Sequence, residues 1–163
     1  MASYSIGKAE VAAWIRENFP SGTILDVGAC DGYWRQLLPE YTMDAVEIFA
    51  PNAEKLIGYR KVICADVCDI ELDDYDLIIF GDVIEHMTVE RAQDVLARAW
   101  HHCRDMIVAV PYMYIQDAMY GNQWERHIQD DLTAELFNER YPGFDVLFMF
   151  NSHQYCYYHK GGI

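Results

Sequence analysis

One loop constrains the fold of this chain more than any other segment, and it reads Leu25-Asp26-Val27-Gly28-Ala29-Cys30-Asp31-Gly32. An apolar run precedes the loop, an amphipathic stretch follows it, and a second apolar run carries Glu47, nineteen residues after Gly28. This order of strand, glycine loop, helix and strand with a terminal acid is typical of the first half of a nucleotide-binding βαβ unit. In such a unit the glycines let the backbone approach a ligand, and the acid binds the two hydroxyls of a ribose.

Apolar runs and amphipathic stretches continue to alternate along the chain. Strands are predicted at residues 23–28, 44–49, 61–65, 76–80 and 106–110, and a terminal hairpin at residues 145–150 and 154–159. Helices are predicted at residues 5–19, 34–39, 88–102 and 133–140, with a short one that begins at Pro51. The pattern predicts an α/β domain with a mostly parallel sheet, helices on both faces and an antiparallel hairpin at the end.

Polar residues and turn formers follow the predicted strands. They are the loop at residues 26–32, Glu47, Asp66, Asp82 and Pro111. Because ligands of parallel sheets bind beyond the carboxyl ends of the strands, we expect these residues to meet at one rim. Residues 112–131 form a long polar and aromatic loop beside the same rim, and a loop of this length in a small domain needs a functional reason.

Composition restricts the classes of partner. The 163 residues suit a single domain, residues 1–163, and the net charge of −14 with scattered Lys and Arg disfavours nucleic acid and anionic membranes. No apolar run is long enough to span a membrane, and no signal peptide is evident. The five cysteines form no CxxC pair, which indicates free thiols in a reducing compartment and a cytoplasmic protein. A zinc site at Cys64 and Cys68 would lack half its ligands.

The glycine loop does not match the dinucleotide fingerprint G-x-G-x-x-G. If Gly28 is its first glycine, the next two positions hold Cys30 and Tyr33. Tyr33 at the third position would prevent the close contact between helix and strand that glycine allows. A dehydrogenase would also need a catalytic domain, for which the chain leaves no room.

The spacing Asp26-x-Gly28-x-x-x-Gly32 resembles instead the first motif of class I S-adenosylmethionine-dependent methyltransferases, with Cys30 where a further glycine is usual. The resemblance covers residues 5–160. It implies a Rossmann-like, doubly wound sheet of seven strands in the order 3-2-1-4-5-7-6, within an α/β/α sandwich. It also implies an N-terminal helix within residues 1–20, an acceptor-side loop at residues 112–131, and S-adenosylmethionine as cofactor.

The resemblance assigns roles residue by residue. Glu47 would bind the ribose hydroxyls, Asp66 would accept from the adenine amine, and Val67 would pack on the adenine ring. The full set expected to bind the cofactor is Asp26, Gly28, Ala29, Gly32, Glu47, Ile48, Asp66, Val67 and Asp82. Simpler roles compete: Asp26 as a cap for loop amides, Glu47 as a solvated acid, and Asp66 as a turn former.

Methyl transfer needs orientation, exclusion of water and, for some acceptors, a base, so no nucleophilic side chain is expected. The sequence Asp82-Val83-Ile84-Glu85-His86 matches a D/E-x-x-E-H motif of small-molecule methyltransferases, and a helical turn would place its acid, Glu85 and His86 on one face. Glu85, His86 and the distant His127 are therefore the expected catalytic residues. The same set resembles the metal site of some relatives, although we assign no metal; the alternatives are His86 or His127 as base, or a structural role.

Residues 111–115 and 119–124 are rich in Met, Tyr and Trp, which suits a flat or apolar acceptor. These residues have two competing roles: they could cover the sheet edge or form a homodimer surface. A methyltransferase that acts on a small molecule at oxygen is the expected function. The alternatives are an RNA or protein acceptor with a partner subunit, and a catalytically silent binding protein with the same fold.

Overall fold

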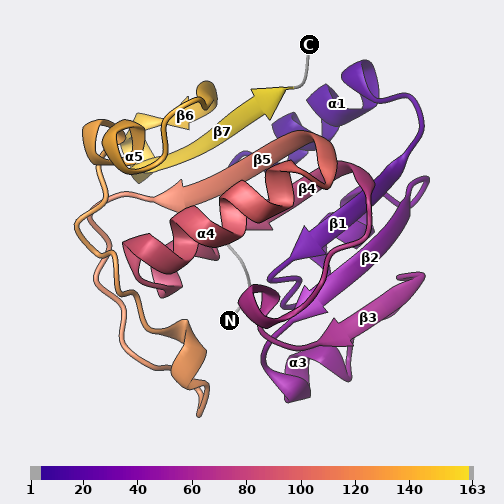
Figure 1. Cartoon of the computed structure of the whole chain (residues 1–163), viewed down its shortest axis with the longest axis horizontal. Coiled ribbons are helices and arrows are strands. Elements are labelled where there is room, and N and C mark those ends of the chain that lie inside the picture. Colours follow the sequence, from indigo (N-terminus) through magenta and orange to yellow (C-terminus); the bar gives the residue numbers. More distant parts are fainter. Residues whose placement is uncertain (1–4, 162–163) are drawn as a thin grey trace.

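The computed structural model describes residues 5–161, which form a seven-stranded sheet between two layers of helices (Figure 1). The strands are β1 Thr23–Val27, β2 Thr42–Glu47, β3 Lys61–Cys64, β4 Tyr75–Gly81, β5 Cys103–Pro111, β6 Asp145–Phe150 and β7 Tyr155–Gly161. The helices are α1 Lys8–Asn18, α2 Tyr33–Leu37, α3 Ala50–Ala53, α4 Val89–Trp100 and α5 Ala134–Arg140.

The strand order is β3-β2-β1-β4-β5-β7-β6. The first five strands run parallel, and β7 pairs antiparallel with both β5 and β6. The predicted fold class, the strand order and the terminal antiparallel hairpin are therefore confirmed.

Each face of the sheet has its own core. Along β4, Ile78 and Phe80 pack with α4 and α5, whereas Leu77 and Ile79 pack with α1 and α2. Successive side chains of a strand point to opposite faces, so a strand covered on both faces must be apolar throughout. This explains why β4 reads as a continuous apolar run and shows no alternation.

Several element boundaries differ from the predicted ones for local reasons. Helix α1 begins at Lys8 and not at residue 5, because Gly7 has φ 73°, which is left-handed backbone. Strand β2 ends at Glu47, since Phe49 already caps α3. The connection from β3 to β4 contains only a 3-10 turn, Val67–Asp69. Within residues 5–161, no helix has both the length and the apolar character that a bilayer span requires.

The topology brings the ends of the parallel strands to one edge. The hairpin adds to this edge, because the first residue of β7, Tyr155, lies opposite Pro111 at the end of β5. Residues distant in sequence thus gather where the parallel strands end.

Candidate cofactor and acceptor site

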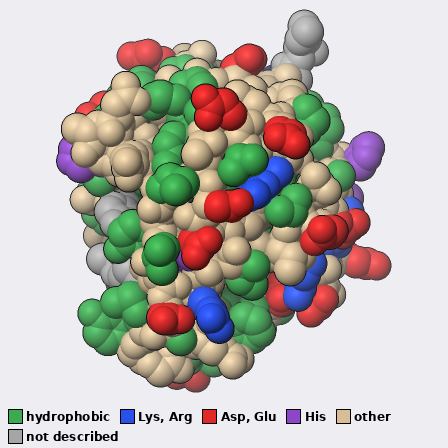
Figure 2. Space-filling view, turned by 90° about the vertical axis from the view of Figure 1, so that its left-hand side faces the viewer, with side chains coloured by type: hydrophobic (Ala, Val, Ile, Leu, Met, Phe, Trp, Pro, Cys, Tyr) green, Lys and Arg blue, Asp and Glu red, His purple; other side chains and the backbone are tan. Residues whose placement is uncertain are grey.

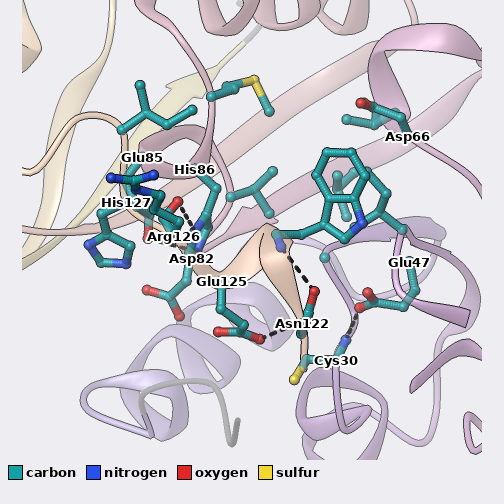
Figure 3. Close-up of a pocket in the computed structure, with 18 of the residues that line it drawn as sticks. Cys30, Glu47, Asp66, Asp82, Glu85, His86, Asn122, Glu125, Arg126 and His127 are labelled. Atoms are coloured by element: carbon teal, nitrogen blue, oxygen red, sulfur yellow. Dashed lines mark hydrogen bonds and ion pairs between the residues drawn. The ribbon is translucent and has the colours of Figure 1, made fainter. Parts of the chain in front are cut away.

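A cavity of about 550 Å³ lies at the carboxyl edge of the sheet. Residues at and after the ends of β1 to β5 line one side, and part of the long loop between Gln116 and Ile128 lines the other (Figure 3). Nine of the predicted site residues line it: Gly28, Glu47, Ile48, Asp66, Val67, Asp82, Glu85, His86 and His127. The rim predicted from the topology is thus a single cavity.

The glycine loop approaches the cavity through left-handed backbone. Gly28 has φ 72°, and a Cβ there would lie 2.5 Å from Val83 Cγ2. Cys30 adopts φ 51° without being glycine, and it lines the cavity. Non-glycine residues in this region are strained, and such strain often marks functional sites.

Glu47 ties the end of β2 to the glycine loop. Its Oε2 accepts from the backbone N–H of Cys30 and its Oε1 from that of Phe49, both at 2.8 Å. Burial raises the pKa of Glu47, and the two amide hydrogen bonds oppose that rise. Because a carboxylate oxygen can accept more than one hydrogen bond, Glu47 retains acceptor capacity towards a diol.

Three predicted cofactor residues do not line the cavity: Asp26, Ala29 and Gly32. Asp26 is completely buried and accepts a 2.5 Å hydrogen bond from the Tyr59 hydroxyl. Ala29 donates its backbone N–H to Val46, and Gly32 caps α2 in left-handed conformation. These residues fix the conformation of the glycine loop without lining the cavity themselves.

Burial raises the pKa of Asp26 from its ordinary 3.8 to about 6, although the Tyr59 hydrogen bond opposes the shift. Between these values the folded protein binds a proton that the unfolded chain releases, so the contribution of Asp26 to stability falls as pH rises. Asp26→Asn should remove this loss. The free energy of unfolding of the variant minus that of the unaltered protein should therefore rise by about 3 kcal/mol from about pH 4 to about pH 7. Urea unfolding of both proteins at the two pH values tests this, and an unchanged difference would contradict it.

Asp66 has the turn-forming role as well as a place in the cavity lining. Its Oδ1 accepts from the Cys68 N–H at 2.9 Å, and its Oδ2 accepts from Arg91 Nη2 at 2.9 Å. Arg91 lines the cavity too and was not identified from the sequence. Contact between Asp66 and an adenine amine stays a prediction.

The predicted helical turn over residues 82–86 is wrong. Asp82 has φ 57°, and a 3-10 turn begins only at Ile84. The left-handed residue ends β4 sharply, and the Asp82 Oδ1 accepts a 2.5 Å hydrogen bond from the Tyr155 hydroxyl of β7. Tyr155 is buried and was not identified from the sequence.

Glu85, His86 and His127 form a compact cluster. One carboxylate oxygen and one nitrogen of each ring all lie within 4.8 Å of one another, and the two rings meet edge to face. His86 Nδ1 lies 3.1 Å from the Arg126 carbonyl, and His127 Nδ1 lies 2.7 Å from the Tyr114 carbonyl. A carbonyl only accepts, so each Nδ1 must donate. This leaves each Nε2 with a lone pair in the neutral ring.

The charge state of the cluster follows from its burial. Burial lowers the pKa of both histidines, which keeps the imidazoles neutral near pH 7. Burial and the nearby Asp82 raise the pKa of Glu85 well above its ordinary value. Among the described residues, neither carboxylate oxygen of Glu85 has a hydrogen-bond partner. A buried carboxyl group without partners is costly, so the cluster is poised to receive a ligand or a cation.

The donor set fits a divalent metal ion. Two imidazoles and a carboxylate are common ligands, and metal-bound histidines usually donate their other ring N–H to a carbonyl. Glu85, His86 and His127 would be the residues that hold such an ion.

Only part of the two aromatic segments of the long loop lines the cavity. Of residues 111–115 and 119–124, only Pro111, Asn122, Gln123 and Trp124 line the cavity. Ile115 and Tyr120 are more than 80% exposed, at 81% and 82%. Acidic side chains are spread over the face in Figure 2, and basic ones are few. The loop instead contributes Gln116 and Glu125, which the sequence did not single out.

No protein-family model and no curated protein matches the chain. Solved structures do. The N-terminal domain of EvdMO1 with S-adenosylhomocysteine bound superposes with a TM-score of 0.69 and 17% identity, over 98% of this chain and 82% of that one. An S-adenosylmethionine-dependent methyltransferase from Clostridium acetobutylicum gives 0.71 and 12%, over 96% and 91%. The 1,6-didemethyltoxoflavin-N1-methyltransferase of Burkholderia thailandensis, with 1,6-didemethyltoxoflavin and S-adenosylhomocysteine bound, gives 0.69 and 17%, over 96% and 78%. The chain therefore has the fold of S-adenosylmethionine-dependent methyltransferases.

Proposed function

We propose that this chain is an S-adenosylmethionine-dependent methyltransferase that methylates a small-molecule acceptor at oxygen. One observation carries the proposal: a single cavity contains both the glycine loop with Glu47 and the Glu85, His86 and His127 cluster. The first group suits a nucleoside, and the second suits the activation of a hydroxyl group.

Each part of the cavity has a defined task in this reaction. Glu47 holds the ribose, and Asp66 and Val67 flank the adenine. The acceptor oxygen attacks the methyl carbon in line, the bond from carbon to sulfur breaks, and its electron pair stays on the sulfur. The hydroxyl proton passes to an Nε2 lone pair of His86 or His127. If Glu85, His86 and His127 held a divalent cation instead, these lone pairs would bind the ion, and its positive charge would lower the pKa of the hydroxyl.

The dimensions and charge of the site favour a small acceptor. A cavity of about 550 Å³ is within the range of small-molecule sites, and it must hold the cofactor as well. The net charge of −14 disfavours a nucleic acid. The Burkholderia thailandensis neighbour acts on a small molecule at nitrogen, so the choice of oxygen here depends on the imidazole cluster alone.

Calorimetry with S-adenosylmethionine tests the proposal. We expect one site with a dissociation constant below about 1 mM, a weak but specific affinity. No heat of binding at millimolar cofactor would contradict the proposal. A screen of hydroxylated small molecules for release of S-adenosylhomocysteine then separates an enzyme from a silent binding protein.

A further inference from the structure

Glu125 is an acidic residue of the long loop that lines the cavity. It belongs to a 3-10 turn, Gln123–Glu125, on the loop side of the cavity. Figure 3 shows its carboxylate between Asp82 on one side and Asn122 and Cys30 on the other, with Glu47 beyond them. The site therefore runs from Glu47 past Glu125 towards Asp82.

Two buried amides hold Glu125 in this position. Asn122 Nδ2 donates to its Oε1 at 3.3 Å, and Gln116 Nε2 donates to its Oε2 at 3.4 Å and to its backbone carbonyl at 2.6 Å. Gln116 and Asn122 are only 9% and 6% exposed. Fixing a carboxylate with buried side chains costs conformational entropy, so its direction is a specific feature of the loop.

The loop is also fixed to the opposite wall of the cavity. The backbone N–H groups of Ile128 and Gln129 both donate to the Glu85 carbonyl, at 2.8 and 3.0 Å. Gln129 Nε2 donates to the carbonyls of Ile84 and Met87. Glu125 is thus held at a set distance from the turn that carries Glu85 and His86.

The covalent structure of the cofactor places its sulfur next to the ribose. If Glu47 binds the ribose and Asp66 flanks the adenine, the sulfonium lies one methylene group beyond the sugar ring, on the side away from Asp66 (Figure 3). Glu125 lies on that side. Its charge also reaches both ends of the site, since it adds to the burial that raises the pKa values of Glu47 and Glu85.

Carboxyl groups outnumber guanidinium groups in the lining of the cavity. Five carboxylates line it, from Glu47, Asp66, Asp82, Glu85 and Glu125, against Arg91 and Arg126. Arg91 pairs with Asp66, and Arg126 pairs with Asp117, which lies outside the lining. Neither carboxylate oxygen of Glu85 has a hydrogen-bond partner among the described residues, which leaves a buried carboxyl group that a polar occupant of the cavity would satisfy.

We propose that Glu125 is a specificity-determining residue whose carboxylate faces the sulfonium and makes the cavity prefer S-adenosylmethionine over S-adenosylhomocysteine. The inference rests on the proposed function. The substrate has a positively charged sulfur and the product a neutral one, so a carboxylate beside the sulfur binds the substrate more tightly and favours release of the product.

The test compares the affinities of both forms for Glu125→Gln and the unaltered protein by calorimetry, with sinefungin as a third ligand that carries an amine beside the same position. Glu125→Gln should weaken S-adenosylmethionine and sinefungin about tenfold, as the loss of a nearby unit charge predicts, and leave S-adenosylhomocysteine within about twofold. Glu125→Asp should retain the preference because it keeps the charge. Glu139→Gln is the matched control, since it removes the same charge from an exposed position on α5.

Equal weakening of all three ligands would overturn the inference, because Glu125 would then only shape the loop. Unchanged affinities would overturn it as well. Failure of the unaltered protein to bind any of the three would instead contradict the proposed function. Thermal unfolding of each variant shows whether a loss reflects the site or the fold.

Discussion

Glu47→Gln should weaken the binding of S-adenosylmethionine and S-adenosylhomocysteine by the same factor, about 100-fold or ~2.7 kcal/mol. Both carboxylate oxygens already accept backbone N–H groups, from Cys30 and Phe49, while the side chain faces the cavity. A glutamine presents an NH₂ group to one of these two donors, so one amide loses its partner and the ribose loses a charged acceptor.

The measurement is calorimetric titration with each form of the cofactor. Glu54→Gln is the matched control, because Glu54 is an exposed acid at the end of α3 and does not line the cavity. Affinities within threefold of the unaltered protein would exclude Glu47 as the ribose acid. The equal effect on both forms separates Glu47 from Glu125, whose charge should affect only the form with a positive sulfur.

The sequence predicted those parts of the site that the sheet itself positions. Glu47 ends one parallel strand, Asp66 and Asp82 follow two others, and the apolar runs before them identify those strands. Once the topology is parallel, their meeting at one edge requires no further information. The same local patterns yielded the terminal hairpin and the order of the elements.

The side of the cavity that the long loop lines could not be predicted in this way. Gln116 and Glu125 lie in a loop without periodicity, and its path is set by hydrogen bonds from Ile128 and Gln129 to Glu85, much earlier in the chain. The aromatic residues of this loop were expected at the acceptor, yet Tyr120 is exposed and Tyr112 bonds to Tyr158. Composition indicates what a loop carries but not which way each side chain points.

The turn after β4 shows the limit of spacing arguments. Spacings of three and four residues suggested a helical face for Asp82, Glu85 and His86, but left-handed backbone at Asp82 interrupts it. Glu85 and His86 still lie close to His127, because the long loop carries His127 back to them. The predicted cluster therefore forms although the predicted local structure was wrong, and its catalytic role stays a prediction.

His86→Ala should reduce methyl transfer by about 10²- to 10⁴-fold, the usual contribution of a positioned base, and leave the affinity for S-adenosylmethionine within about twofold. Its Nδ1 donates to the Arg126 carbonyl, which directs the Nε2 lone pair towards Glu85 and His127. His127→Ala should behave in the same way. His101→Ala, at the exposed end of α4, is the control.

The pH dependence gives the His86 prediction a second, independent readout. Burial lowers the pKa of His86 below the ordinary 6.5, and that of His127 likewise. Because the reaction needs the neutral ring, turnover should stay level from about pH 8 down to 6.5 and fall only below that. The assay is the release of S-adenosylhomocysteine with an acceptor from the screen.

Metal analysis of the purified protein, together with turnover after dialysis against a chelator, separates a base from a metal ligand, since only the latter role makes activity depend on a bound ion. Full activity of His86→Ala would remove the imidazole cluster from the mechanism, and with it the argument for oxygen as the methylated atom.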